Sequence, residues 1–135
     1  MAEVFDAIVM YQQDRKEKDL MVKMLTKQGG KRMFYIKNGK SKRYQFAADV
    51  QPLTVATFEG TLNPTGLSFI NAVKESHQSR ELMMDVTKNA YMTYILGLID
   101  AAFVDNQPIG KWYEWARLAI EKIESGLDPQ GIANF

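Results

Sequence analysis

The sequence predicts an α+β fold, with a small five-stranded barrel or sandwich in its first part and helices in its second. Apolar residues recur with period two up to about residue 76 and with helical spacing after it. Glycine-rich and Asn-Gly turn signals divide the first part into short runs. The chain of 135 residues has no cysteine, and it is long enough to bury a core without disulfides or a structural metal.

Three strands are predicted before residue 38. The second covers 20–25 and the third 33–37, and they are separated by Gly29-Gly30 and followed by Asn38-Gly39, both of which are strong turn signals. Alternation in the first strand predicts that four side chains share one face. These residues are Phe5, Ala7, Val9 and Tyr11.

Two further strands are predicted at 52–60 and 66–74. The sequence "TLNPT" between them favours a loop, because Asn-Pro restricts the backbone to turn conformations. Five short strands in about 75 residues are typical of a small barrel or sandwich.

Helices are predicted from Ser79, a suitable N-cap, with long helices at about 86–104 and 109–125 separated by "DNQP". Asp128-Pro129 has the pattern of a further helix start. We therefore expect two domains, a strand-rich, OB-fold-like domain at 1–76 and a helical domain at 77–135 that is incomplete at its C-terminal end.

Positive charge is concentrated in the first part of the chain. Residues 1–76 carry 12 basic and 8 acidic side chains, a net +4, whereas 77–135 carry 5 and 8, a net −3. No acid occurs between Asp19 and Asp49, and "KRMFYIKNGKSKR" interleaves basic and aromatic residues. This pattern is typical of a surface that binds a phosphate backbone, on which Tyr35 could stack a base. The predicted DNA-binding residues are Lys31, Arg32, Tyr35, Lys37, Lys40, Lys42 and Arg43.

The strand that carries this block has two faces. Alternation places Lys31, Met33, Tyr35 and Lys37 on one face, and the intervening Arg32, Phe34 and Ile36 on the other. The methionines are expected to fill the core.

Catalytic and metal-binding patterns are weak. His77 is the single histidine, without cysteine or a second histidine beside it, and we expect a solvated residue there. Glu121 and Glu124 resemble an ordinary solvated helix face. No nucleotide-binding glycine motif occurs, so no cofactor, metal or catalytic residue is predicted. Trp112 and Trp115 have helical spacing, which favours core or interdomain packing over base stacking.

The N-terminal sequence lacks the pattern of a signal peptide, and Asp100 interrupts the most apolar segment, which is too short to span a bilayer. The sequence therefore predicts a cytoplasmic protein with no membrane association.

The segments "DLMVKMLTKQGGK" and "AADVQPLTVATFEG", with a Gly-Lys-Ser-Lys-Arg loop between them, resemble the N-terminal part of the bacterial recombination mediator family RecO. The resemblance implies an N-terminal OB-fold followed by helices. It also implies binding of single- and double-stranded DNA, strand annealing, and cooperation with RecR and single-strand-binding protein to load RecA. Members commonly carry a cysteine zinc motif further along, so its absence here is expected if the sequence is a fragment of about half a member.

A second reading stays open. The chain could be a protein-interaction adaptor whose helices bind a partner while its basic face meets an acidic peptide. An acidic peptide and DNA are both polyanions, so the charge pattern does not separate the two. A hydrolase is disfavoured, because no carboxylates cluster at metal-ligand spacing.

Overall fold

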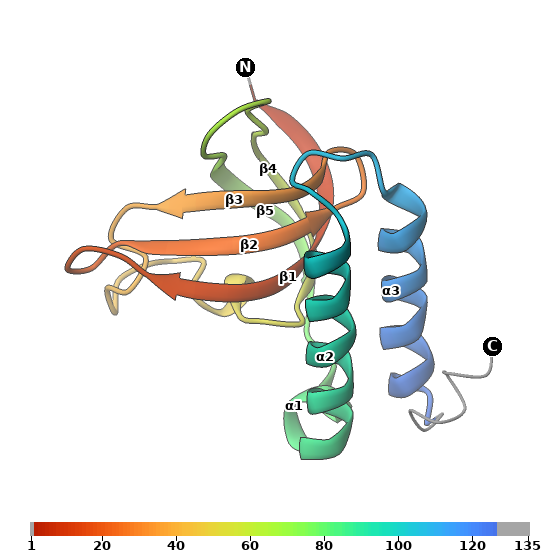
Figure 1. Ribbon diagram of the computed structural model, residues 1–135. Coiled ribbons are helices and arrows are strands. Elements are labelled where there is room, and N and C mark those ends of the chain that lie inside the picture. The colour runs from red at the N-terminus through yellow and green to blue at the C-terminus, as the bar shows by residue number, and fades with distance from the viewer. Residues whose placement is uncertain (1, 127–135) are drawn as a thin grey trace.

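The computed structural model describes residues 2–126, in which a five-stranded antiparallel sheet precedes three α-helices (Figure 1). This arrangement confirms the predicted α+β class, with an OB-fold-like sheet followed by a helical segment. The elements are β1 (Glu3–Asp14), β2 (Leu20–Thr26), β3 (Gly30–Ile36), a 3-10 turn η1 (Ala48–Val50), β4 (Val55–Thr61), β5 (Phe69–His77), α1 (Arg80–Met84), α2 (Val86–Ala102) and α3 (Gly110–Glu124).

The strands are ordered β3-β2-β1-β4-β5 in the sheet. The edge strands β3 and β5 come together at one parallel bridge, Phe34 with Ser68. Two hydrogen bonds form it, from the Tyr35 amide to the Ser68 carbonyl (3.0 Å) and from the Ser68 amide to the Met33 carbonyl (2.9 Å). The sheet is therefore curled towards a barrel and is not closed by a continuous ladder.

Curling gives the sheet an inner and an outer face, and each face has its own core. Phe5, Phe34 and Phe58 are fully buried inside the curl, where the rings of Phe5 and Phe34 stack at a centroid distance of 5.5 Å. Ile8 and Leu25 lie on the outer face, in a second core shared with the helices. Both faces of β1 and β2 are therefore covered over part of their length.

The helices α2 and α3 stand side by side against the outer face of β1 and β2 (Figure 1). The Ser79 hydroxyl accepts a hydrogen bond from the Leu82 amide, as its predicted N-cap role requires, and Asp85 caps α2 through the Lys88 amide. No helix in residues 2–126 has both the length and the apolar character needed to cross a membrane.

Element boundaries differ from the prediction mainly after β3. Residues 48–53 form η1 and a turn in which Leu53 has φ +72°, so β4 begins at Val55 rather than at 52. The fifth strand lies three residues later than predicted. The predicted helix start at Asp128-Pro129 lies outside the described residues. The division at residue 76 stays a prediction, because the sheet and helices share a core.

Candidate nucleic-acid interface

The β1–β2 loop and the segment after β3 lie at the end of the sheet away from α2 and α3 (Figure 1). Residues of this loop and segment line a basic hollow. Its volume, about 1120 Å³, exceeds the roughly 300–1,000 Å³ of ordinary small-molecule pockets, so it suits an extended ligand. The residues that line it are Lys18, Lys37, Asn38, Lys40, Ser41, Lys42, Arg43, Tyr44 and Gln45.

Most cations of the basic hollow have no acidic partner. Lys40 has a long contact to Asp14 at 4.0 Å, and its ammonium donates to the Arg15 carbonyl at 3.2 Å. The other four cations form no ion pair with any residue in 2–126, and all are exposed. They are Lys18, Lys37, Lys42 and Arg43. The fold thus brings together four of the predicted residues and adds Lys18, which the sequence analysis did not select.

Tyr35 lies beside this hollow and is held by its hydroxyl. The hydroxyl donates to Asp19, and the same carboxylate accepts the Asn38 amide at 2.9 Å. These hydrogen bonds, from Asn38 first and Tyr35 second, together with the charge of Lys37, hold the pKa of Asp19 below its usual value. Asp19 is therefore ionised at neutral pH and fixes the position of the Tyr35 ring.

The outer face next to Tyr35 carries further side chains that the sequence analysis did not assign to a site. A β-bulge between Val9 and Tyr11 reverses the alternation of β1, so Tyr11 pairs with Lys23 on the outer face instead of following Val9 into the curl. Tyr11 is 38% exposed. Met21 and Met33 are half-buried on this face, in register with Tyr35 and Lys23, rather than in the core as expected.

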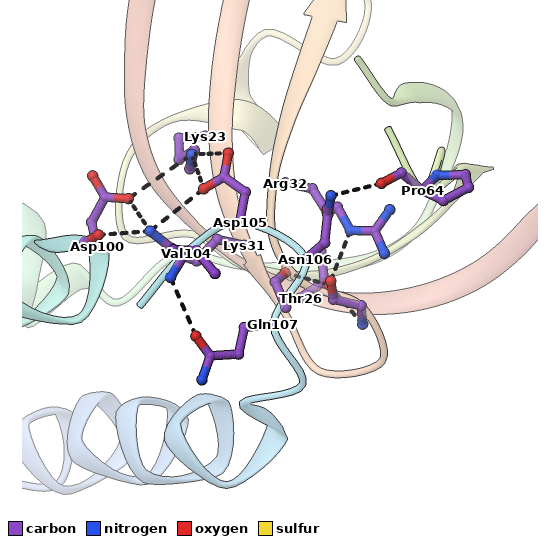
Figure 2. Close-up of polar contacts among 12 residues, drawn as sticks. Lys23, Thr26, Lys31, Arg32, Pro64, Asp100, Val104, Asp105, Asn106 and Gln107 are labelled. Carbon is purple, nitrogen blue, oxygen red and sulfur yellow. Dashed lines mark hydrogen bonds and ion pairs between the residues drawn. The ribbon is translucent and has the colours of Figure 1, made fainter. Parts of the chain in front are cut away.

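Lys31 and Arg32 have intramolecular partners. The Lys31 side chain is 3% exposed, and its ammonium lies 2.8 Å from Asp100 in α2 (Figure 2). The Arg32 guanidinium donates to the backbone carbonyls of Gly29 and Asn63. Neither residue lines the basic hollow, and their predicted contact with DNA stays untested.

Lys31 belongs to a four-residue ion cluster that also contains Lys23, Asp100 and Asp105 (Figure 2). The buried Lys23 ammonium lies 2.6 Å from Asp105 and 3.9 Å from Asp100. Burial acts to raise the pKa of Asp105, but the hydrogen bond from Lys23 and the charges of Lys23 and Lys31 outweigh it, so the pKa is lowered. Asp105 is therefore ionised at neutral pH.

The remaining polar candidates have structural partners. The ring of His77 is exposed and lies 2.5 Å from Glu124, which connects the end of β5 to α3. Glu121 pairs with Arg117 at 3.1 Å. Within residues 2–126 no group of three His, Asp or Glu side chains could hold a metal ion.

The aromatic residues of α3 divide between two environments. Tyr113 is buried in the core with the sheet. Trp112 is 39% exposed and, with the half-buried Trp115, lines an apolar hollow of about 250 Å³ between α2 and α3. The other residues that line it are Ile95, Leu98, Ile99, Ala102 and Phe103.

Comparison with known proteins gives one consistent result. Residues 1–78 match the family described as "Recombination protein O N terminal". The chain is 46% identical over 130 residues to "DNA repair protein RecO" of Limosilactobacillus reuteri, covering 96% of this chain and 50% of that protein. The proteins of the same description from Latilactobacillus sakei and Leuconostoc mesenteroides are 41% and 38% identical, over 98% of this chain and 49% and 52% of their lengths. The chain spans about half the length of these curated relatives.

Proposed function

Because the chain belongs to the recombination protein O family, we propose that it is the DNA-binding part of a non-enzymatic recombination mediator that acts in DNA repair. The observation that carries this proposal is the basic hollow, in which four exposed cations without ion-pair partners in residues 2–126 surround one surface. Such cations release counterions from a nucleic-acid backbone, which drives binding independently of base sequence.

The proposed DNA path runs from the basic hollow onto the outer face of β2 and β3. This face of an OB-fold and its loops are the parts that bind oligonucleotides in many members of the fold. Tyr35 and Tyr11 offer rings to unstacked bases, while Lys37 and its neighbours contact phosphates. We propose that single strands occupy both parts, and that double-stranded DNA contacts the cations alone.

Annealing follows from the same surface. A sequence-independent cationic site neutralises phosphates on two strands and lowers their mutual repulsion, which favours pairing. Cooperation with RecR and single-strand-binding protein, and the loading of RecA on coated strands, belong to this proposal as functions of the longer protein. We assign them to no residue of this chain.

A triple replacement tests the basic hollow. Changing Lys40, Lys42 and Arg43 together to Ala should weaken binding of a single-stranded oligothymidine and reduce the magnitude of the salt slope by about 2, at roughly 0.7 per phosphate contact. Folding should hardly change, because these side chains lie in an exposed loop. Fluorescence anisotropy titrations at several salt concentrations measure the slope.

A control variant with the same loss of charge replaces Lys74, Lys111 and Lys122, which are exposed on β5 and α3. It should retain most of the slope. If both triple variants lose the same slope, the net charge rather than the basic hollow drives binding, and this location of the site is wrong.

One observation favours the adaptor as a second candidate function. The apolar hollow between α2 and α3 exposes Trp112 and Leu98, a surface suited to an apolar partner segment. Titrating an acidic peptide in parallel with oligothymidine separates the candidates. An adaptor should bind the peptide at least as tightly as DNA of equal charge, whereas the proposed DNA site should prefer the strand and lose that preference when Tyr35 is replaced.

A further inference from the structure

The connector between α2 and α3, residues 103–109, lies across the start of β3 and the β4–β5 loop. The Asn106 amide donates to the Lys31 carbonyl at 3.0 Å, and the Asn106 side chain donates to the Pro64 carbonyl at 2.7 Å (Figure 2). An acidic segment of the chain thus rests on the strand and loop that border the proposed DNA path.

Asp105 carries the negative charge of this connector to the outer face. It approaches Lys23 at 2.6 Å and Lys31 at 3.5 Å while remaining 47% exposed. It also lies near Tyr11, since burial first, and then the charges of Asp100 and Asp105, raise the pKa of that tyrosine. The Asp105 carboxylate therefore lies at the end of the Tyr11, Met33 and Tyr35 surface that is nearest the helices.

The buried Lys23 ammonium requires a neighbouring negative charge, but a phosphate could supply that charge in place of the Asp105 carboxylate. A lysine this well buried is costly without a counter-charge, whereas the net gain from a buried ion pair is small. Replacing a carboxylate oxygen by a phosphate oxygen keeps the pairing, so the exchange costs little. The Asp100 carboxylate lies 3.9 Å from the Lys23 ammonium. Because Asp100 belongs to α2 and not to the connector, displacement of the connector would leave it beside Lys23.

The connector is held mainly by polar contacts. Residues 104–108 are all exposed, Val104 to 72%, and the apolar anchors Phe103 and Ile109 lie at the two ends. Release of 104–108 would expose little apolar surface. We therefore expect the free energy of opening this segment to be low compared with that of unfolding the whole protein.

We propose that Asp105 occupies a phosphate position on the outer face of β2 and β3, so that the connector is an internal competitor that a nucleic-acid strand displaces. The strand then contacts Lys23, and the site extends from the basic hollow past Tyr11 to the helices. This inference rests on the proposed DNA-binding function and adds a residue and a regulating segment to it.

Three variants test the competition by oligothymidine titration against salt. Asp105→Asn should tighten binding at every salt concentration, because no carboxylate then has to be displaced, while the slope stays near that of the wild type, since the strand contacts Lys23 in both proteins. Lys23→Met with Asp105→Asn removes both charges and keeps most of the side-chain volume, so this gain should disappear. Glu121→Gln, an exposed change of equal charge on α3, should leave the affinity close to that of the wild type. An Asp105→Asn affinity equal to that of the wild type, or a gain in affinity that persists without Lys23, overturns the inference.

A measurement on the wild-type chain gives an independent answer if a variant fails to fold. Hydrogen–deuterium exchange of the Asn106 amide, which is bonded to Lys31, should accelerate when oligothymidine binds. Unchanged or slower exchange in the bound state means that the connector stays in place, and only the competition is then wrong. If neither the wild type nor Asp105→Asn binds the strand at low salt, the proposed function itself fails.

Discussion

Lys31 and Lys37 belong to one basic block, yet their side chains have different environments. Lys31 lies at the helix-covered end of the outer face, where Asp100 reaches it from 69 residues further along the chain. Lys37 follows the opposite end of β3, where it is exposed beside the basic hollow. The position along the strand, and not the residue type, therefore decides which lysine stabilises the fold and which is free to bind a ligand.

Tyrosine replacements test the stacking surface at the scale of single residues. Tyr35→Ala and Tyr11→Ala should each weaken oligothymidine binding by about 1–3 kcal/mol with little change in salt slope, because a stacked ring contributes no counterion release. Tyr35→Phe keeps the ring and loses only the hydroxyl bond to Asp19, so it should bind nearly as the wild type does. Anisotropy titrations at one salt concentration and at several provide both quantities.

Equal losses for Tyr35→Phe and Tyr35→Ala would show that the hydroxyl, not the ring, is what binding requires. A loss confined to Tyr35→Ala, with Tyr11→Ala unchanged, would restrict the strand to the end of the face near the basic hollow.

The sequence locates part of this candidate site. The absence of acids between Asp19 and Asp49 is a local pattern, and it identifies four of the five cations that the fold gathers in the basic hollow; Lys18 lies outside it. The burial of Lys31 depends on Asp100, and the exposure of Tyr11 depends on a bulge without glycine or proline to signal it. Neither has a local signature, because both arise from contacts or register changes that alternation within one strand does not encode.

At the scale of elements, the β2–β3 turn and the α2–α3 connector fit together at Gly30. This residue has φ +72°, and a Cβ added there would lie 2.2 Å from the Gln107 carbonyl oxygen. Glycine therefore satisfies two requirements, a left-handed backbone and close approach of a second segment. The Gly-Gly pair predicted the turn, but not the segment that packs on it.

Two glycine replacements separate these requirements. Gly66 has φ +81° with no atom near an added Cβ, so Gly66→Ala should cost about 1 kcal/mol of unfolding free energy from backbone strain alone. Gly30→Ala must also displace the connector, so its loss should be larger, on the order of 3 kcal/mol. Urea denaturation measures both. Equal losses of unfolding free energy in the two variants would mean that displacing the connector from Gly30 has no energetic cost.

Element types follow from sequence more reliably than element limits do. Period-two and helical spacing reflect the face that is buried, so all five strands and the helices after Ser79 are predicted. The start of β4 depends on η1 and on the positive φ of Leu53. A non-glycine residue in that conformation is held by its surroundings rather than by its own preference. The start of β4 therefore cannot be read from the neighbouring sequence.

At the scale of the whole molecule, one sheet separates two apolar cores. The core inside the curl includes Phe58 and is bordered by Tyr44, whereas the core between the sheet and the helices includes Tyr113. Because β1 and β2 contribute to both cores, loss of either should remove support from the other. We therefore expect a single cooperative unfolding transition.

Alkaline pH tests this coupling through the two tyrosines. Burial is the main cause that raises the pKa of Tyr44 and of Tyr113, each to about 12, against about 10 in an unfolded chain. The folded state therefore holds these protons more tightly, so their contribution to stability is complete below pH 10 and is lost as pH rises from about 10 to about 12. Phenylalanine at either position removes the ionisable group and should make the loss of stability less steep than in the wild type. Comparison of the two proteins at equal pH cancels the contributions of the ionisable groups that they share.

The decisive measurement is how the helices respond to Tyr44→Phe, because Tyr44 packs against the core inside the curl and not against the core between the sheet and the helices. Tryptophan fluorescence reports on α3, since Trp112 and Trp115 both lie in this helix. If the two cores unfold together, Tyr44→Phe shifts the alkaline transition of this fluorescence to higher pH, as Tyr113→Phe also does. A shift with Tyr113→Phe alone would mean that the helices leave the sheet while the curl remains folded, as they would if the α2–α3 connector opened far enough to carry α3 with it.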